Sequence, residues 1–137
     1  MKLGSILGLL LATAATGAGA APGPLWERFP HLVCRLEDQV ACYKGSCDTK
    51  PMQGLWDVNF TKYLVTYLGS DDTEAIVGRN RTGPDTEVSM DAFLLSSSRM
   101  MVFLNAADDP GRELEAQVVG AFGPYTRTIH LTCAVPK

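Results

Sequence analysis

Four cysteines constrain this chain more than any other feature. Cys34, Cys42 and Cys47 lie close together, and Cys133 lies near the C-terminal end. In a short exported chain an even number of cysteines is typical of a disulfide framework, and four cysteines allow three pairings. Whether they form disulfides, bind a metal or act as a redox pair therefore depends first on whether the chain is exported.

Residues 1–20 predict a secretory signal peptide. One lysine precedes an uncharged run rich in leucine and alanine, residues 3–15, and Ala18-Gly19-Ala20 has the small-x-small form of a cleavage site. The run is short for a membrane span, which needs about 20 apolar residues. No cysteine follows it closely, which disfavours a lipid anchor. We expect cleavage after Ala20 and a periplasmic or secreted mature protein.

The charge balance disfavours nucleic acid as a partner. The chain has 12 basic and 15 acidic residues, and Lys2 is the one charge within residues 1–20, so the mature chain carries 11 against 15, a net charge of −4. Its basic residues are scattered, whereas phosphate binding needs clustered Lys and Arg. We expect no membrane span after signal cleavage, a proline-rich lead-in at 21–30 and a single β domain over 31–137.

The rest of the chain is rich in patterns typical of strands. Short apolar or alternating runs are separated by turn residues such as GSDD at 69–72 and SSS at 96–98. Connections this short permit antiparallel hairpins but not parallel crossovers. The predicted fold is therefore all-β, an antiparallel meander forming a small barrel or a strongly curved sheet. Strands are expected near 31–37, 40–43, 55–60, 62–68, 73–79, 87–95, 100–105, 113–122 and 125–135.

The segment ELEAQVVGAF at 113–122 shows the clearest alternation. Its two parities separate an apolar set from a polar set, which is typical of a strand with one buried and one solvated face. The residues predicted to be buried are Leu114, Ala116, Val118 and Phe122, and those predicted to be exposed are Glu113, Glu115 and Gln117.

The same parity argument predicts the disulfides. Cys34 shares a strand face with Leu32 and Leu36, and Cys133 shares one with Ile129, Leu131 and Val135. Both thiols then point to the apolar side of their strands, so a bridge between them would tie the first strand to the last. Two disulfides are predicted, Cys34–Cys133 and Cys42–Cys47.

A zinc site and a redox pair are the alternatives. His31-x-x-Cys34 and His130-x-x-Cys133 together offer a Cys₂His₂ ligand set, which zinc accepts. Residues three apart on a strand face opposite sides, however, so each histidine would point away from its cysteine. A redox pair needs closer thiols, usually C-x-x-C at the start of a helix. We therefore expect no metal and no cofactor.

The cysteine layout also carries a resemblance. C-x₇-C-x₄-C after a signal peptide, with a last strand ending in Cys133, resembles small exported bacterial all-β proteins of unknown function. A looser similarity is to bacterial periplasmic lysozyme inhibitors of the small-barrel type, which also tie an early strand to a late one through cysteines. Those proteins carry an S-G-x-x-Y loop, and the nearest match here, SSRMM at 97–101, lacks both the glycine and the tyrosine.

No constellation typical of catalysis stands out. Neither His31 nor His130 lies near a serine elbow, an HExxH motif or paired carboxylates. DDPG at 108–111 supplies two carboxylates, too few for a calcium shell of six to eight oxygens. Asn59 and Asn80 each begin an N-x-T sequon, with Asn80 expected in a turn, although such matches arise by chance in a bacterium.

The sequence thus favours a non-enzymatic interaction module whose partner is another envelope or secreted protein. An alternative comes from residues 64–68 and from Leu94, Leu95, Val102 and Leu104, which are apolar on both parities. This pattern suggests strands that are covered on both faces or that line a cavity. A barrel of about eight strands can hold one small apolar ligand, so a lipocalin-like carrier is a second hypothesis. A periplasmic enzyme inhibitor is a third.

Overall fold

A computed structural model describes residues 23–82, 90–105 and 113–137, which form one short helix and nine strands. The expected signal peptide, residues 87–89 of the expected strand 87–95, and the DDPG segment lie outside the described residues. No helix in the described ranges is long and apolar enough to cross a membrane. The elements are α1 (Leu25–Arg28), β1 (His31–Tyr43), β2 (Ser46–Pro51), β3 (Leu55–Asn59), β4 (Leu64–Leu68), β5 (Thr73–Thr82), β6 (Met90–Leu95), β7 (Met101–Asn105), β8 (Leu114–Phe122) and β9 (Tyr125–Ala134).

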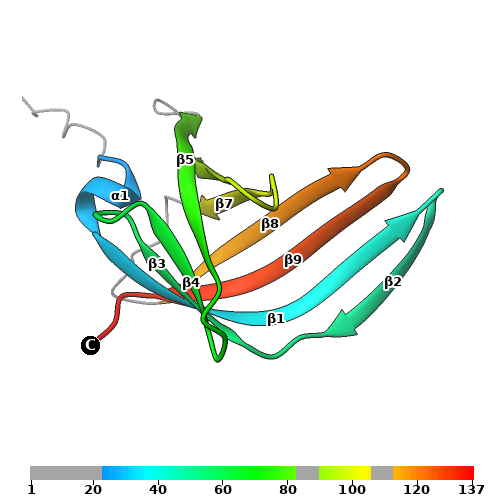
Figure 1. The fold of residues 1–137 in the computed structure, drawn as a ribbon, viewed down its shortest axis with the longest axis horizontal. Coiled ribbons are helices and arrows are strands. Elements are labelled where there is room, and N and C mark those ends of the chain that lie inside the picture. The colour runs from blue at the N-terminus through cyan, green and yellow to red at the C-terminus, as the bar shows by residue number, and fades with distance from the viewer. Residues whose placement is uncertain (1–22, 83–89, 106–112) are drawn as a thin grey trace, which may run out of the picture.

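The strands form a closed antiparallel barrel, as Figure 1 shows. From β3 to β9 each strand pairs with the next along the chain, and β1 pairs with β3 on one edge and β9 on the other. Eight strands therefore close on themselves, and β2 is added outside the ring. The predicted all-β meander is confirmed, and of its two expected forms the closed barrel is the one observed.

Strand β1 is long enough to belong both to the barrel and to a sheet that extends beyond it. Residues 31–35 pair with β3 inside the barrel, while residues 38–43 pair with β2, and β9 follows nearly the whole opposite edge. An irregularity between Leu36 and Asp38 separates the two halves. The sequence had suggested two short strands here and no strand at 46–51. Instead β1 is one continuous strand, and its second half pairs with the added strand β2.

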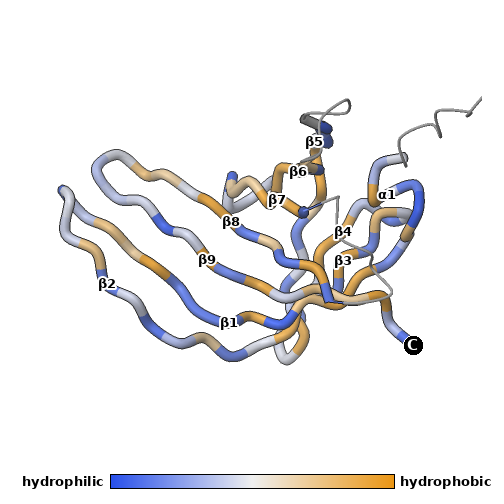
Figure 2. The backbone as a smooth tube through the Cα atoms, turned by 180° about the vertical axis from the view of Figure 1, so that it is seen from behind, coloured by the Kyte–Doolittle hydropathy of each residue, from blue (hydrophilic) through white to orange (hydrophobic). Residues whose placement is uncertain are grey.

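The interior of the barrel is filled with side chains. The inward residues form one buried cluster, in which the rings of Phe60 and Phe93 meet edge to face with centroids 5.6 Å apart. Apolar residues recur along the barrel strands in Figure 2, whereas β2 is mostly hydrophilic. An eight-stranded barrel has an interior that side chains can fill, and these residues fill it. Among the fully buried members are Leu32, Val58, Val65, Phe93, Leu95, Leu104, Leu114 and Val118.

Helix α1 packs against the barrel. Leu25 is fully buried, and its backbone N–H donates to Oδ2 of Asp91 at 2.7 Å. Trp26 and Phe29 pack against the core. Residues 25–28 of the proline-rich lead-in expected at 21–30 therefore form a helix that the sequence did not predict. A four-residue helix is too short to show the apolar period by which a helix is recognised.

Most of the alternation predicted for β8 is confirmed. Leu114, Ala116 and Val118 are buried, and the polar residues between them are exposed. Phe122 was predicted to be buried and is 51% exposed. The reason is that β7 pairs with β8 only as far as Val119, so the end of β8 extends past the barrel and has no core to pack against.

Both predicted disulfides are present. Cys34 and Cys133 are register partners on β1 and β9, are buried, and join the two strands that close the barrel. The second bridge, Cys42–Cys47, joins β1 to β2 across their hairpin. Because Cys34 and Cys133 are bonded to each other, the alternative Cys₂His₂ ligand set does not form.

Candidate interaction surface

Four strands continue beyond the barrel as a projecting sheet, here called the ribbon. It consists of β2 with residues 38–43 of β1, 120–122 of β8 and 125–128 of β9, in the order β2-β1-β9-β8. Figure 1 shows these strands running out to the side opposite α1. Within the described chain, neither β2 nor the end of β8 has a strand on its outer edge.

Tight turns form the two tips of the ribbon. Lys44 and Gly45 connect β1 to β2 with φ values of 49° and 85°, as a type I′ turn requires. Gly123, with φ 63°, and Pro124 connect β8 to β9, which suits a type II′ turn. The Lys44 N–H donates to the Pro124 carbonyl at 3.3 Å, so the two tips are also joined to each other.

One face of the ribbon continues the interior face of the barrel, and it ends in three aromatic residues. Tyr43 lies directly opposite Tyr125, which lies directly opposite Phe122. Tyr125 shares its parity with the buried Ile129, which fixes the face. Tyr43 and Phe122 are 53% and 51% exposed. We call Tyr43, Tyr125 and Phe122 the aromatic row.

Gly120 makes room for this row. A Cβ at Gly120 would lie 3.0 Å from Cγ of Met100 and 3.1 Å from Cε2 of Phe122, which is closer than carbon atoms normally approach. Met100 and the Phe122 ring therefore cover the glycine. Opposite Gly120 stands Arg127, whose Nε is buried and has no hydrogen-bond partner among the described residues. A buried donor without a partner costs stability.

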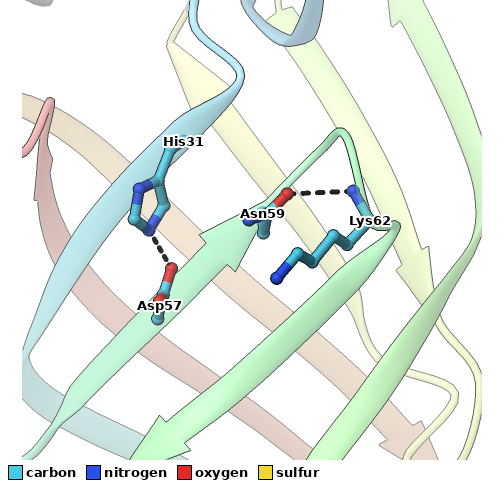
Figure 3. Close-up of polar contacts among 4 residues, drawn as sticks. All are labelled: His31, Asp57, Asn59 and Lys62. Atoms are coloured by element: carbon cyan, nitrogen blue, oxygen red, sulfur yellow. Dashed lines mark hydrogen bonds and ion pairs between the residues drawn. The ribbon is translucent and has the colours of Figure 1, made fainter.

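Both histidines lie on the outside of the barrel, each paired with an aspartate. Figure 3 shows His31 on β1 pointing toward Asp57 on β3, with Nε2 against Oδ1. His130 Nδ1 lies 2.6 Å from Oδ1 of Asp38. In the described chain each imidazole hydrogen-bonds only its aspartate. An aspartate orients an imidazole, but catalysis by such a pair also needs a nucleophile or a bound water within reach.

The surroundings of His130 are acidic. Glu37, Asp38 and Glu115 line one outer cleft together with His130. A hydrogen bond from the side chain of Thr132, helped by the neighbouring Arg35 guanidinium, lowers the pKa of Glu37 below its usual value. The Glu37 carboxylate is therefore favoured in its charged form, and a negative charge is a poor setting for stabilising an oxyanion.

An apolar cleft of about 400 Å³ lies outside the barrel, over β6, β7 and β8. Its apolar lining comes from Met90, Phe103 and Val119. The sequence had suggested that residues 64–68 with Leu94, Leu95, Val102 and Leu104 lie on strands that are covered on both faces or line a cavity. The inward members of this set are Val65, Leu95, Val102 and Leu104, and they are buried in the filled core.

The two sequons lie in different settings, and that of Asn80 is not the one expected. Asn80 lies within β5, opposite Ala92, so the prediction of a turn there is wrong. Asn59 ends β3, and its Oδ1 accepts the backbone N–H of Lys62 at 2.9 Å (Figure 3). Asn59 therefore caps the turn between β3 and β4.

The segment compared with the inhibitor loop forms the tight turn between β6 and β7. The N–H and hydroxyl of Ser98 donate to the two carboxylate oxygens of Glu74 at 2.9 Å and 2.8 Å. Met100 is buried beneath Gly120. These contacts hold the turn against β5 and the ribbon.

Comparison with protein-family models, curated proteins and solved structures finds no match. Sequence reasoning identified the cysteines of the ribbon but missed the aromatic row. One sequence feature could have revealed the row: an aromatic residue stands next to each two-residue turn. Tyr43 precedes Lys44-Gly45, and Tyr125 follows Gly123-Pro124.

Proposed function

We propose that the protein is a non-enzymatic interaction module that binds another envelope or secreted protein through the aromatic row. One observation carries the proposal. Three aromatic side chains stand side by side on a sheet that projects beyond the core, and two of them are half exposed. Aromatic residues dominate the binding energy of protein interfaces because they combine large apolar area with few rotatable bonds.

The support of the row is rigid, which favours binding. The Cys42–Cys47 disulfide, the two tight turns and the hydrogen bond between the tips fix the strands that carry it. A preorganised surface loses less conformational entropy when a partner binds.

The other functions have less support. A carrier needs interior space, whereas the inward side chains pack as one cluster and Leu25 is buried against it. A lysozyme inhibitor of the small-barrel type would use an exposed loop, whereas Ser98 is held by Glu74. An enzyme would need a nucleophile beside one of the two Asp–His pairs.

The disulfides and the N-terminal sequence support a proposed compartment. Two disulfides are compatible with an oxidising extracellular compartment. The small-x-small motif at Ala18-Gly19-Ala20 and the resemblance to small exported bacterial proteins support the narrower proposal of a periplasmic or secreted protein. A partner from the same compartment would meet the aromatic row directly.

The test is partner capture with matched variants. Mature protein carrying a cross-linker would be mixed with an envelope fraction of its source, and the captured protein would then be purified and titrated directly. We expect Phe122→Ser and Tyr43→Ser each to weaken binding about tenfold or more. Leu68→Ser is the control, because Leu68 is 46% exposed on β4, away from the row.

Two results would contradict the proposal. One is a partner whose affinity changes equally for Leu68→Ser and Phe122→Ser. The other is native mass spectrometry of protein from its own source that finds a stoichiometric small apolar ligand, which would favour the carrier.

A further inference from the structure

The hydrogen-bonding direction of β2 determines what its outer edge can bind. The Met52 N–H donates to the Glu37 carbonyl at 2.9 Å, which marks the positions that bond to β1. Cys42 and Cys47 face each other with Cα atoms 4.0 Å apart, the short spacing of a non-hydrogen-bonded antiparallel pair. Ser46, Asp48 and Lys50 therefore bond to β1, and the odd-numbered residues of β2 turn their backbone groups outward.

The outward-pointing backbone groups of β2 form a short edge without a paired strand among the described residues. Thr49 and Cys47 each present an N–H and a C=O, while Pro51 presents a C=O alone. Proline is tolerated at this position because its missing N–H would have pointed away from β1. All six residues of β2 are exposed, so no described side chain covers the edge. Such an edge accepts another strand.

The charges on β2 select both the partner and the register. Asp48 and Lys50 lie on one face of the strand, their side chains 81% and 72% exposed, with Oδ2 and Nζ 4.0 Å apart. The sequence Asp-Thr-Lys is self-complementary when two copies run antiparallel. With Thr49 opposite Thr49, Asp48 of each copy stands opposite Lys50 of the other.

Neighbouring registers are unfavourable. A second copy of β2 can be displaced along the first only in steps of two residues. A displacement by one residue would place residues that bond to β1 opposite the outward-pointing backbone groups. One such shift puts Asp48 opposite Asp48, and the other puts Lys50 opposite Lys50. Like charges directly opposite each other destabilise a strand pair, whereas opposite charges stabilise it.

We propose that β2 pairs with β2 of a second copy, centred on Thr49. The two threonines exchange a pair of N–H···O=C bonds, and each Cys47 N–H donates to the Pro51 carbonyl of the other copy. Asp48 and Lys50 form two cross-strand ion pairs. The ribbons become one continuous sheet with a twofold axis perpendicular to it.

This association goes beyond the proposed function. Because the axis is perpendicular to the sheet, both aromatic rows face the same side of the dimer. A partner with two suitable sites would then bind both rows, and the second contact would form at high effective concentration. The dimer itself does not depend on what the row binds.

The experiment is sedimentation of the mature, disulfide-bonded protein from micromolar to millimolar concentration, at low and high salt. We expect reversible dimerisation that weakens as salt rises. Asp48→Lys and Lys50→Asp should each weaken dimerisation about tenfold or more, since each replaces both ion pairs with like charges. Lys44→Asp is the control, because it changes the net charge as Lys50→Asp does but lies at the turn.

Complementation makes the test specific to the register. An equimolar mixture of the Asp48→Lys and Lys50→Asp proteins should form heterodimers, and the doubly swapped protein should dimerise like the wild type. Thr49→Pro should abolish dimerisation while leaving the bonds from β2 to β1 intact. A wild type that stays monomeric throughout, or a mixture no better than its single variants, would overturn the proposal.

Discussion

At the scale of single residues, Gly120 decides the shape of the ribbon's inner face. Its missing side chain admits Met100 and the Phe122 ring, which would otherwise be displaced. Gly120→Val should therefore destabilise the protein by about 1 to 3 kcal/mol, as overpacking does. Denaturant unfolding measures the change. Gly78→Ala is the control, because the nearest atom to its new Cβ would be 3.9 Å away; an equal loss in both variants would contradict the argument.

Asp91 is a second residue on which the structure depends, because it holds helix α1 against the barrel. Its buried carboxylate accepts the Leu25 N–H, and Arg81 Nε lies 3.5 Å from its other oxygen. Asp91→Ala should leave a buried donor without its acceptor, at a cost of about 1 to 3 kcal/mol, and should loosen α1. Hydrogen exchange of the Leu25 amide reports this directly. Unchanged protection of that amide would show that apolar packing alone holds the helix.

At the scale of elements, the sequence predicted those strands whose two faces differ. β8 alternates because one face meets the core, and the prediction failed at Phe122, where the core ends. β2 was not predicted, because all its residues are exposed and its sequence therefore shows no apolar alternation. It is a strand because the Lys44-Gly45 turn folds it back on β1.

The candidate site was less predictable than the fold. The predicted export favoured disulfides, and parity then paired Cys34 with Cys133, because both thiols lie on apolar faces. The aromatic row depends instead on the register of three strands, in which Tyr43, Tyr125 and Phe122 become neighbours. The irregularity between Leu36 and Asp38 also reverses the parity of β1. A one-residue change of parity moves every later side chain to the other face, and no local pattern marks it.

The short disulfide should matter to β2 more than to the barrel. Cys42–Cys47 spans a sequence separation of 5 and joins two strands of the ribbon. Replacing both cysteines with serine should speed hydrogen exchange of the inward-bonded amides of β2, such as Asp48 and Lys50, because the edge strand can then separate from β1. Amides of β6 and β7 should exchange as before. Equal acceleration in the barrel would mean that the ribbon and the barrel unfold as one unit.

At the scale of the whole molecule, closure depends on β1 and β9. These strands are far apart in the sequence, yet they pair along nearly their whole length and share the buried Cys34–Cys133 bridge. The same two strands continue into the ribbon, so the pairing that closes the barrel also holds the aromatic row in place. Stability of the core and order of the binding surface are therefore linked through one pair of strands.

This linkage predicts different consequences for the two disulfides. Cys34–Cys133 spans a sequence separation of 99, so replacing both residues with alanine should cost about 4 to 5 kcal/mol through the unfolded chain. Loss of the buried sulfurs adds to that, because Cys34 and Cys133 are 2% and 0% exposed. The matched double alanine variant of Cys42 and Cys47 should lose much less, since its loop is short. Denaturant midpoints of the two variants decide the matter: equal shifts would mean that the β1–β9 pairing, and not the bridge, keeps the barrel closed.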